Sequence, residues 1–201
     1  EYATGKNSKW GERYSAMVPS APINADWMNA KNWRKTNHLY FDASFLNGEF
    51  KAWLEGNTVQ TKDGKIVDIL RVHAPALQDE YCAIVDISKN GKKAIFNKAN
   101  FFKMPGASKK FTLRYDKETD KYWSLVNYIP DEFKSTRTDR ARNTLALVSS
   151  NNLKEWKIEK ILQSNPDPIY HAFQYIDWLF EGNDIIYLSR TAYDDEEGGA
   201  D

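Results

Sequence analysis

The sequence predicts an all-β fold, a β-propeller with four-stranded blades of about 60 residues. Short runs rich in Val, Ile, Phe, Tyr and Trp are bounded by Asn, Asp and Gly, a pattern typical of strands. No segment longer than ten residues keeps the apolar spacing of a capped helix. A strand–turn–strand–strand pattern returns three times at an interval of about 60 residues. Self-similarity at a fixed period, with four strands in each period, is the signature of propeller blades.

The repeat divides the chain into four consecutive segments of a single propeller domain or fragment. We expect a partial blade over residues 1–46, whole blades over 47–105 and 106–165, and a partial blade over 166–201. Propellers close with roughly four to eight blades, the last pairing with the first. We therefore expect this chain to be part of a larger propeller. A closed ring of four blades that shares one split blade is the alternative.

Each hairpin of the pattern is expected to join two apolar runs through a short polar turn. The three turns are 62–65, 117–121 and 181–184, and they contain the Gly, Asp and Asn residues that such turns favour. The predicted strands are, in chain order, 14–18, 50–54, 66–72, 81–87, 111–115, 122–129, 144–148, 173–180 and 185–189.

An aromatic residue follows the third strand of each segment. Trp33, Phe96 and Trp156 are 63 and 60 residues apart, and we expect them to pack between blades rather than to face a ligand. Asp177 and Trp178 are expected to be a packing pair within a strand.

The composition excludes several classes of protein. Lys and Arg total 28, as do Asp and Glu, so no electrostatic footprint for nucleic acid is present. No run of 18 apolar residues predicts a membrane span. The single cysteine, Cys82, cannot form an internal disulfide, and we expect it to be buried as a small apolar residue. No phosphate-binding glycine loop or nucleophile elbow occurs.

We expect no cofactor and no metal. Three histidines and one cysteine, spread along the chain, do not have the spacing of a zinc site. The acidic run 194–197 leaves calcium as the one alternative, although it lacks the spaced ligands of a dedicated loop.

Blade geometry gathers polar side chains on one rim, where first strands begin, second strands end and third strands begin. Several arginines there suit an anionic ligand, because guanidinium binds carboxylate in bidentate fashion. Each also has a structural alternative: an arginine in a rim salt bridge, a hydrogen-bonded histidine, or a glutamate beside a bulge at Gly56. The substrate-binding candidates are Arg71, His73, Asn127, Arg142, Gln174 and Arg190, and the catalytic candidates are Glu55, His171, Tyr193 and Asp194.

Several of these segments carry a resemblance to a known family. Residues 142–156 resemble a blade of sialidase-type propellers, and 88–96 resembles a degenerate Asp-box, although the full Ser-x-Asp-x-Gly-x-x-Trp pattern occurs nowhere. The combination of 53–57, 111–116, 173–178 and 189–195 is similar to bacterial sialidase-like (BNR-repeat) glycosyl hydrolases of polysaccharide degraders.

The resemblance implies an activity and roles. Sialidases hold the sialate carboxylate with three arginines and use a Tyr–Glu pair as nucleophile, with an Asp as acid and base. By position in the blade, Arg71, Arg142 and Arg190 would be such arginines, and Tyr193 with Glu55 the nucleophile and its partner. The implied substrate is an acidic glycan that contains sialic or uronic acid, and the implied location is secreted or periplasmic.

Two other functions stay open. One is a polysaccharide lyase that acts on uronate polymers, and the other is a non-catalytic carbohydrate-binding propeller. In each case the partner is a carbohydrate, and we expect a monomer or a weak oligomer.

Overall fold

The computed structural model describes residues 9–134 and 136–196 and confirms the all-β class. Strands make up 44% of it and helix 9%, and the antiparallel sheets include no closed one. Within these ranges no helix has the length and apolar character needed to cross a membrane. The helical segments are the short 3₁₀ turns Gly11–Arg13, Ala30–Asn32, Phe45–Gly48, Lys98–Asn100 and Asp131–Phe133.

The chain forms two compact units. The first unit contains the described residues up to His73 together with Ala83–Phe101. The second unit contains Ala74–Cys82 and the described residues from Phe102 onward.

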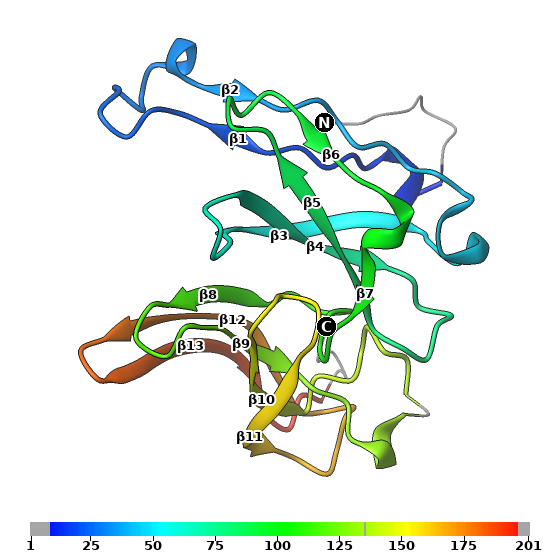
Figure 1. The fold of residues 1–201 in the computed structure, drawn as a ribbon. Helices are drawn as coiled ribbons and strands as arrows, with labels where there is room; N and C mark the ends of the chain where they lie inside the picture. Colours follow the sequence, from blue (N-terminus) through cyan, green and yellow to red (C-terminus); the bar gives the residue numbers. More distant parts are fainter. Residues whose placement is uncertain (1–8, 135, 197–201) are drawn as a thin grey trace. The chain divides into compact units, whose positions relative to one another are not determined.

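One sheet has the strand order β3-β4-β5-β6, with β7 paired to β5 (Figure 1). Most of it belongs to the first unit, while the start of β5 and the end of β7 belong to the second. Consecutive strands are therefore neighbours, as a blade requires. The strands are β3 (Ala52–Gln60), β4 (Ile66–His73), β5 (Tyr81–Ile87), β6 (Ala94–Ile95) and β7 (Phe101–Lys103).

The prediction of a strand over 14–18 is wrong. No strand is formed there: Ala16 makes an isolated bridge with Leu39, and the first strand of the described residues is the two-residue β1 (Pro19–Ser20), paired with β2 (Arg34–Lys35). Side chains replace part of the ladder, because the Val18 amide donates to the Thr36 hydroxyl at 3.1 Å.

Aromatic rings form the centre of the first unit. Trp53 lies 5.2 Å from Phe96 and 4.7 Å from Phe50, measured between ring centroids. Phe96 thus packs in a core, as predicted. The same prediction is wrong for Trp33, which is 46% exposed because its indole N–H is held by the carbonyl of Trp27 in a surface loop.

The second unit contains a complete four-stranded antiparallel sheet and a hairpin. The sheet order is β11-β10-β9-β8, and β12 pairs with β13. The bounds are β8 (Thr112–Asp116), β9 (Lys121–Asn127), β10 (Thr144–Ser150), β11 (Lys157–Ser164), β12 (Ala172–Glu181) and β13 (Asp184–Ala192).

Strand β12 packs against the sheet that starts with β8. Leu125, Leu145, Ile176 and Trp178 form a buried cluster between them. The Trp178 indole also donates to the carbonyl of Thr112 at 2.8 Å. Trp178 is a core residue, and it attaches the hairpin to the edge strand β8. The predicted packing pair with Asp177 is wrong, because Asp177 is exposed and its carboxylate lies 3.3 Å from Arg114 Nη2.

The turns that follow β5 and β10 share a local geometry. Asn90 Oδ1 accepts the amide of Lys92 at 3.1 Å, and Asn152 Oδ1 accepts that of Lys154 at 3.0 Å. The residue after each asparagine is left-handed, with φ +67° at Gly91 and +66° at Leu153. In both turns an asparagine side chain thus accepts a backbone amide two residues further along the chain, a local hydrogen bond that Asn and Asp favour.

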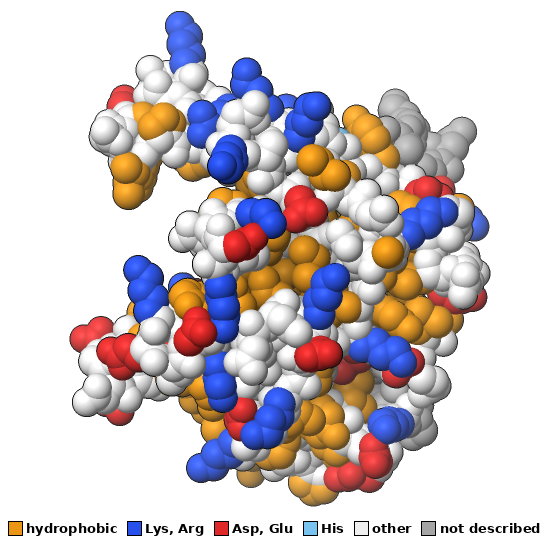
Figure 2. All heavy atoms as spheres, in the orientation of Figure 1, with side chains coloured by type: hydrophobic (Ala, Val, Ile, Leu, Met, Phe, Trp, Pro, Cys, Tyr) orange, Lys and Arg blue, Asp and Glu red, His pale blue; other side chains and the backbone are white. Residues whose placement is uncertain are grey.

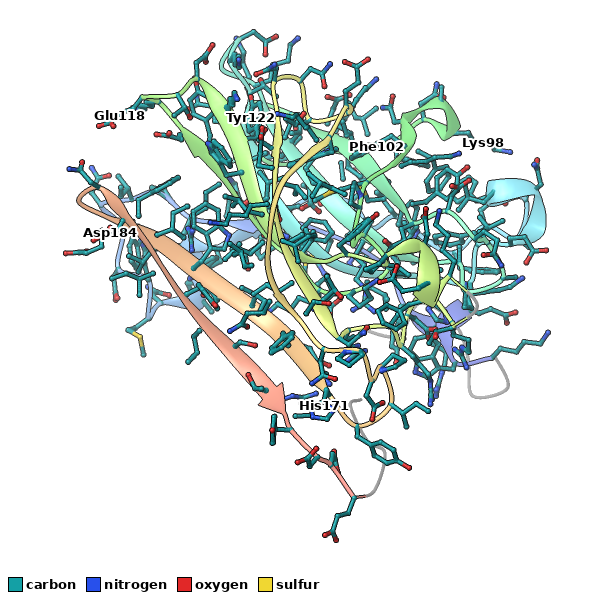
Figure 3. All side chains as sticks on the ribbon, turned by 90° about the horizontal axis from the view of Figure 1, so that it is seen from below. Lys98, Phe102, Glu118, Tyr122, His171 and Asp184 are labelled. Carbon is teal, nitrogen blue, oxygen red and sulfur yellow. The ribbon has the colours of Figure 1, made fainter. Side chains whose placement is uncertain are left out.

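Two ends can be distinguished in the second unit (Figure 3). Glu118 and Asp184, in the turns β8–β9 and β12–β13, lie at one end, and His171 lies at the other. The short turns of this unit are therefore remote from the start of β12, as blade geometry predicts.

Candidate functional site

A bulge in the β12–β13 hairpin shapes the end that carries His171. Gln174 pairs with Arg190 and Asp177 with Leu188, so two residues of β12 oppose one of β13. Within the bulge Tyr175 has φ +52°, a conformation that costs a non-glycine residue about 1–2 kcal/mol. Bulges re-aim side chains, and this one turns Tyr175 toward a group of cations.

These cations form the arginine cluster, which we define as Lys110, Arg142, Gln174, Tyr175 and Arg190. Arg142 Nη1 donates to Gln174 Oε1 at 2.9 Å, and Arg190 Nη2 donates to the same oxygen. The Arg190 guanidinium lies 4.4 Å from the centroid of the Tyr175 ring. Arg142 and Lys110 each lie 5.9 Å from that centroid. Two guanidinium groups are therefore held beside each other on one acceptor and one ring.

The arginine cluster carries positive charge that no acidic side chain in the described part of the chain neutralises. In residues 9–134 and 136–196, no carboxylate forms an ion pair with Lys110, Arg142 or Arg190. The shared acceptor, Gln174, is a neutral amide that is 2% exposed. Like charges at this spacing repel each other, so an anion that bridges them is favoured. Elsewhere, on the face seen in Figure 2, basic and acidic side chains are interspersed.

Asn127 holds the backbone behind this cluster. Its side-chain amide donates to the carbonyl of Arg142 at 3.2 Å and to that of Phe173 at 2.5 Å. Both amide hydrogens are thus used, and the residue is buried. Asn127 therefore positions Arg142 and β12 and does not face solvent.

A histidine, an aspartate and a tyrosine meet at the same end of the hairpin. His171 Nε2 lies 3.1 Å from Asp194 Oδ1, and Nδ1 lies 3.8 Å from Asp167 Oδ2. The edge of the Tyr193 ring packs on the imidazole with centroids 4.9 Å apart. The His171 side chain is mostly buried, whereas Asp194 and Tyr193 are exposed. The exposed carboxyl group of Asp194 is thus held by the mostly buried imidazole of His171.

Three candidates lie in the first unit. Arg71 Nη1 pairs with Glu55 Oε2 at 2.9 Å across a bulge between Trp53 and Gly56. The bulge that Gly56 predicted is therefore present. The His73 ring packs edge-on against Trp10, with centroids 5.4 Å apart.

The structure thus arranges the predicted residues in separate groups. Arg142, Gln174 and Arg190 converge, and His171, Tyr193 and Asp194 form a second group in the same unit. The Glu55–Arg71 pair and His73 belong to the first unit.

Sequence reasoning missed two members of the cluster and one buried acid. Tyr175 was not predicted because the bulge in β12 interrupts the alternation of inward and outward side chains. Lys110 was not predicted because it lies outside the strands. Asp68 is buried on β4, and a charge within an otherwise apolar strand was the available signal.

Cys82 behaves as expected for a core residue. It is fully buried, with Sγ 4.0 Å from the sulfur of Met104, and burial raises the pKa of its thiol well above the usual range. No group of three or more metal-ligating side chains occurs in the described part of the chain. Of the acidic run 194–197 that is the calcium alternative, Glu197 lies outside the described residues.

No family model and no curated protein matches the chain. The functional evidence is therefore the arrangement of side chains within each unit.

Proposed function

We propose that the protein is a sialidase-like glycoside hydrolase that acts on an acidic glycan. The observation that carries the proposal is the pair Arg142 and Arg190, which share the buried oxygen of Gln174 and have no carboxylate partner in the described residues. A sialate or uronate carboxylate supplies the missing anion, and planar guanidinium groups match its geometry.

The His171–Asp194 pair gives this site a proton donor. Hydrolysis of a glycosidic bond needs a proton on the leaving oxygen and a nucleophile or base at the anomeric carbon. In the proposal the His171–Asp194 pair donates a proton to the leaving oxygen and takes up the phenol proton of Tyr193, whose oxygen bonds to the anomeric carbon as the glycosidic bond breaks. Water then releases the sugar and restores the phenol. Glu55 pairs with Arg71 in the first unit, and the roles proposed here rest on residues of the second unit.

We propose further that the sheets are blades of a propeller. Three features support this: consecutive strands form four-stranded sheets, the hairpin β12–β13 packs on β8 through its first strand, and two Asn-centred turns share one geometry. Each is what a radial repeat requires.

The test is turnover of sialylated and uronate-containing glycans, measured as released sugar or reducing ends. Arg190→Ala and His171→Ala are expected to lower turnover by about 100-fold or more. The first removes a guanidinium that binds the substrate carboxylate, and the second removes part of the proton donor. Circular dichroism checks that each variant is folded.

The matched control is Arg137→Ala in the same unit. Arg137 is exposed and already paired with Asp139 at 2.7 Å, so its loss leaves turnover unchanged. Full activity of the Arg190 variant would overturn the assignment.

A polysaccharide lyase is the second candidate. The contact of Tyr193 with His171 favours it, because β-elimination needs a base for the proton beside the carboxylate and an acid for the leaving oxygen. A lyase forms an unsaturated product that absorbs in the ultraviolet, and a hydrolase does not. Binding of glycan without either product would identify a non-catalytic carbohydrate-binding protein.

A further inference from the structure

Asp68 is a buried acid that has no partner among residues 9–134 and 136–196. It lies on β4 in the first unit and is 6% exposed. No described residue gives its carboxyl a hydrogen bond or an ion pair. The side chain lines a cavity of about 450 Å³, together with Ser15, His38, Gly56 and Thr58.

An unpaired buried carboxyl is costly and requires an explanation. Burial alone raises the pKa of Asp68 to about 6, because no neighbouring cation compensates for the loss of water. Each buried polar group left without a partner costs about 1–3 kcal/mol. A ligand that donates hydrogen bonds to Asp68 would remove this cost.

Gly56 keeps the space in front of the carboxyl open. A Cβ atom on Gly56 would lie 2.3 Å from Asp68 Oδ1 and 2.5 Å from Oδ2. Any side chain at this position would therefore displace the carboxyl or fill the space beside it.

A hydroxyl donor lines the same cavity. Ser15 Oγ lies 2.8 Å from His38 Nδ1, and the other ring nitrogen, Nε2, lies 3.2 Å from Lys35 Nζ. Because an ammonium group only donates, Nε2 accepts, so Nδ1 carries the hydrogen and donates to Ser15. The hydroxyl hydrogen of Ser15 is then left to donate to a ligand, and His38 does not act as its base.

The rest of the lining is apolar. Leu54, Leu70 and Ala16 contribute side chains beside the polar groups. A wall with acid and hydroxyl groups next to aliphatic carbon matches a sugar ring, which has hydroxyls at its edge and C–H groups on its face.

We propose that this cavity binds a neutral sugar and that two adjacent hydroxyls of the sugar ring donate hydrogen bonds to Asp68. The acid disfavours a carboxylated sugar, and the Lys35–His38 pair on the Ser15 side disfavours a cation. This site belongs to the first unit and does not depend on the proposed hydrolase activity of the second.

The experiment is calorimetric titration of the whole chain with the methyl glycosides of glucose, galactose, mannose and N-acetylglucosamine. At least one is expected to bind. Asp68→Asn is expected to weaken that binding by about 10-fold or more, because hydrogen bonds to a charged group are lost. Gly56→Ala is expected to weaken it further by filling the space.

Two controls separate this site from general effects. Asp86→Asn, at an exposed position of β5, and Arg137→Ala, at an exposed position of the second unit, should leave glycoside binding unchanged. In a ¹³C titration of the carboxyl groups, bound glycoside should lower the pKa of Asp68 from about 6, since donated hydrogen bonds favour the charged form. Absence of binding by all four glycosides, or equal binding by the Asp68 variant, overturns the proposal.

Discussion

The hairpins β3–β4 and β12–β13 use the same backbone device with opposite electrostatics. Each has a bulge in which two residues of the first strand oppose one of the second. In β3–β4 the residue opposite the bulge is Arg71, and Glu55 within the bulge pairs with it. In β12–β13 Arg190 pairs in register with Gln174, a neutral residue, and packs on Tyr175 in the bulge.

The difference shows how one fold element can serve two purposes. The Glu55–Arg71 pair satisfies its charges within the protein, so it has little to offer an anion. The arginine cluster leaves its charges for a partner outside the described chain. Exchanging the neutral and acidic side chains between the two hairpins tests this distinction directly.

The largest effect is expected from Gln174→Glu. The new carboxylate would lie between Arg142 and Arg190, neutralise both, and repel an acidic sugar. We expect affinity for sialyllactose or an oligogalacturonate to fall by roughly 1,000-fold, about 4 kcal/mol, as for loss of a desolvated charge pair. Calorimetric titration measures the change.

A matched control is Gln163→Glu, at an exposed position of β11 in the same unit. It adds the same charge away from the cluster and should leave affinity almost unchanged. Wild-type affinity in the Gln174 variant would show that the cluster does not bind the anion.

The next effect concerns the stability of the β3–β4 hairpin. The pKa of Asp68 is raised to about 6 from its usual 3.8, so the folded state binds this proton more tightly than the unfolded state. Below about pH 4 Asp68 is protonated in both states and does not lower the free energy of unfolding. As the pH rises through about 6 the carboxyl ionises in the folded state, and this stability is lost. Asp68→Asn should stabilise the protein by about 3 kcal/mol near pH 7 and by little near pH 4.

Urea unfolding at the two pH values measures this difference. Asp63→Asn is the control on the same hairpin, because hydrogen bonds from Lys65 and Thr61 lower the pKa of Asp63 to about 2. That substitution removes a favourable interaction and should not stabilise the protein at either pH. An Asp68 variant that is less stable than wild type near pH 7 would contradict the assignment of an unpaired acid.

The smallest effect is expected from Glu55→Gln. The Glu55 side chain is half exposed, and exposed ion pairs contribute about 0–1 kcal/mol. Thermal unfolding should therefore shift only slightly, while Arg71 gains a neutral partner like that of Arg190. A large destabilisation would mean that the two bulges differ in packing and not only in charge.

Much of the fold could be predicted from local pattern. The strands β5 and β10 begin at Tyr81 and Thr144, where the sequence predicts them, because turn residues mark their starts. Gly56 predicts the bulge in β3, since glycine allows a close approach of chain segments. The prediction of a strand over 14–18 is wrong because a side-chain hydrogen bond replaces part of its ladder. The prediction that Trp33 is buried is wrong because its indole donates to a carbonyl within a surface loop.

The candidate site was predicted only in outline. Strand ends identify Arg142, Gln174 and Arg190 as neighbours of one edge, since the hairpin register depends on the pattern of alternation. Their convergence on a single oxygen depends on the directions of the side chains, which the bulge in β12 alters. The alternation of apolar and polar residues does not predict those directions.

The sequence by itself determined the all-β class, the order of the strands and the balance of charge, because these depend on local propensity and composition. Only the tertiary structure decided which charges are neutralised. Glu55 reaches Arg71, Gln174 takes the place of an acid beside Arg190, and Asp68 is buried alone. Electrostatic energy depends on distance and on exclusion of water, and both are set by packing between segments that are distant in the chain.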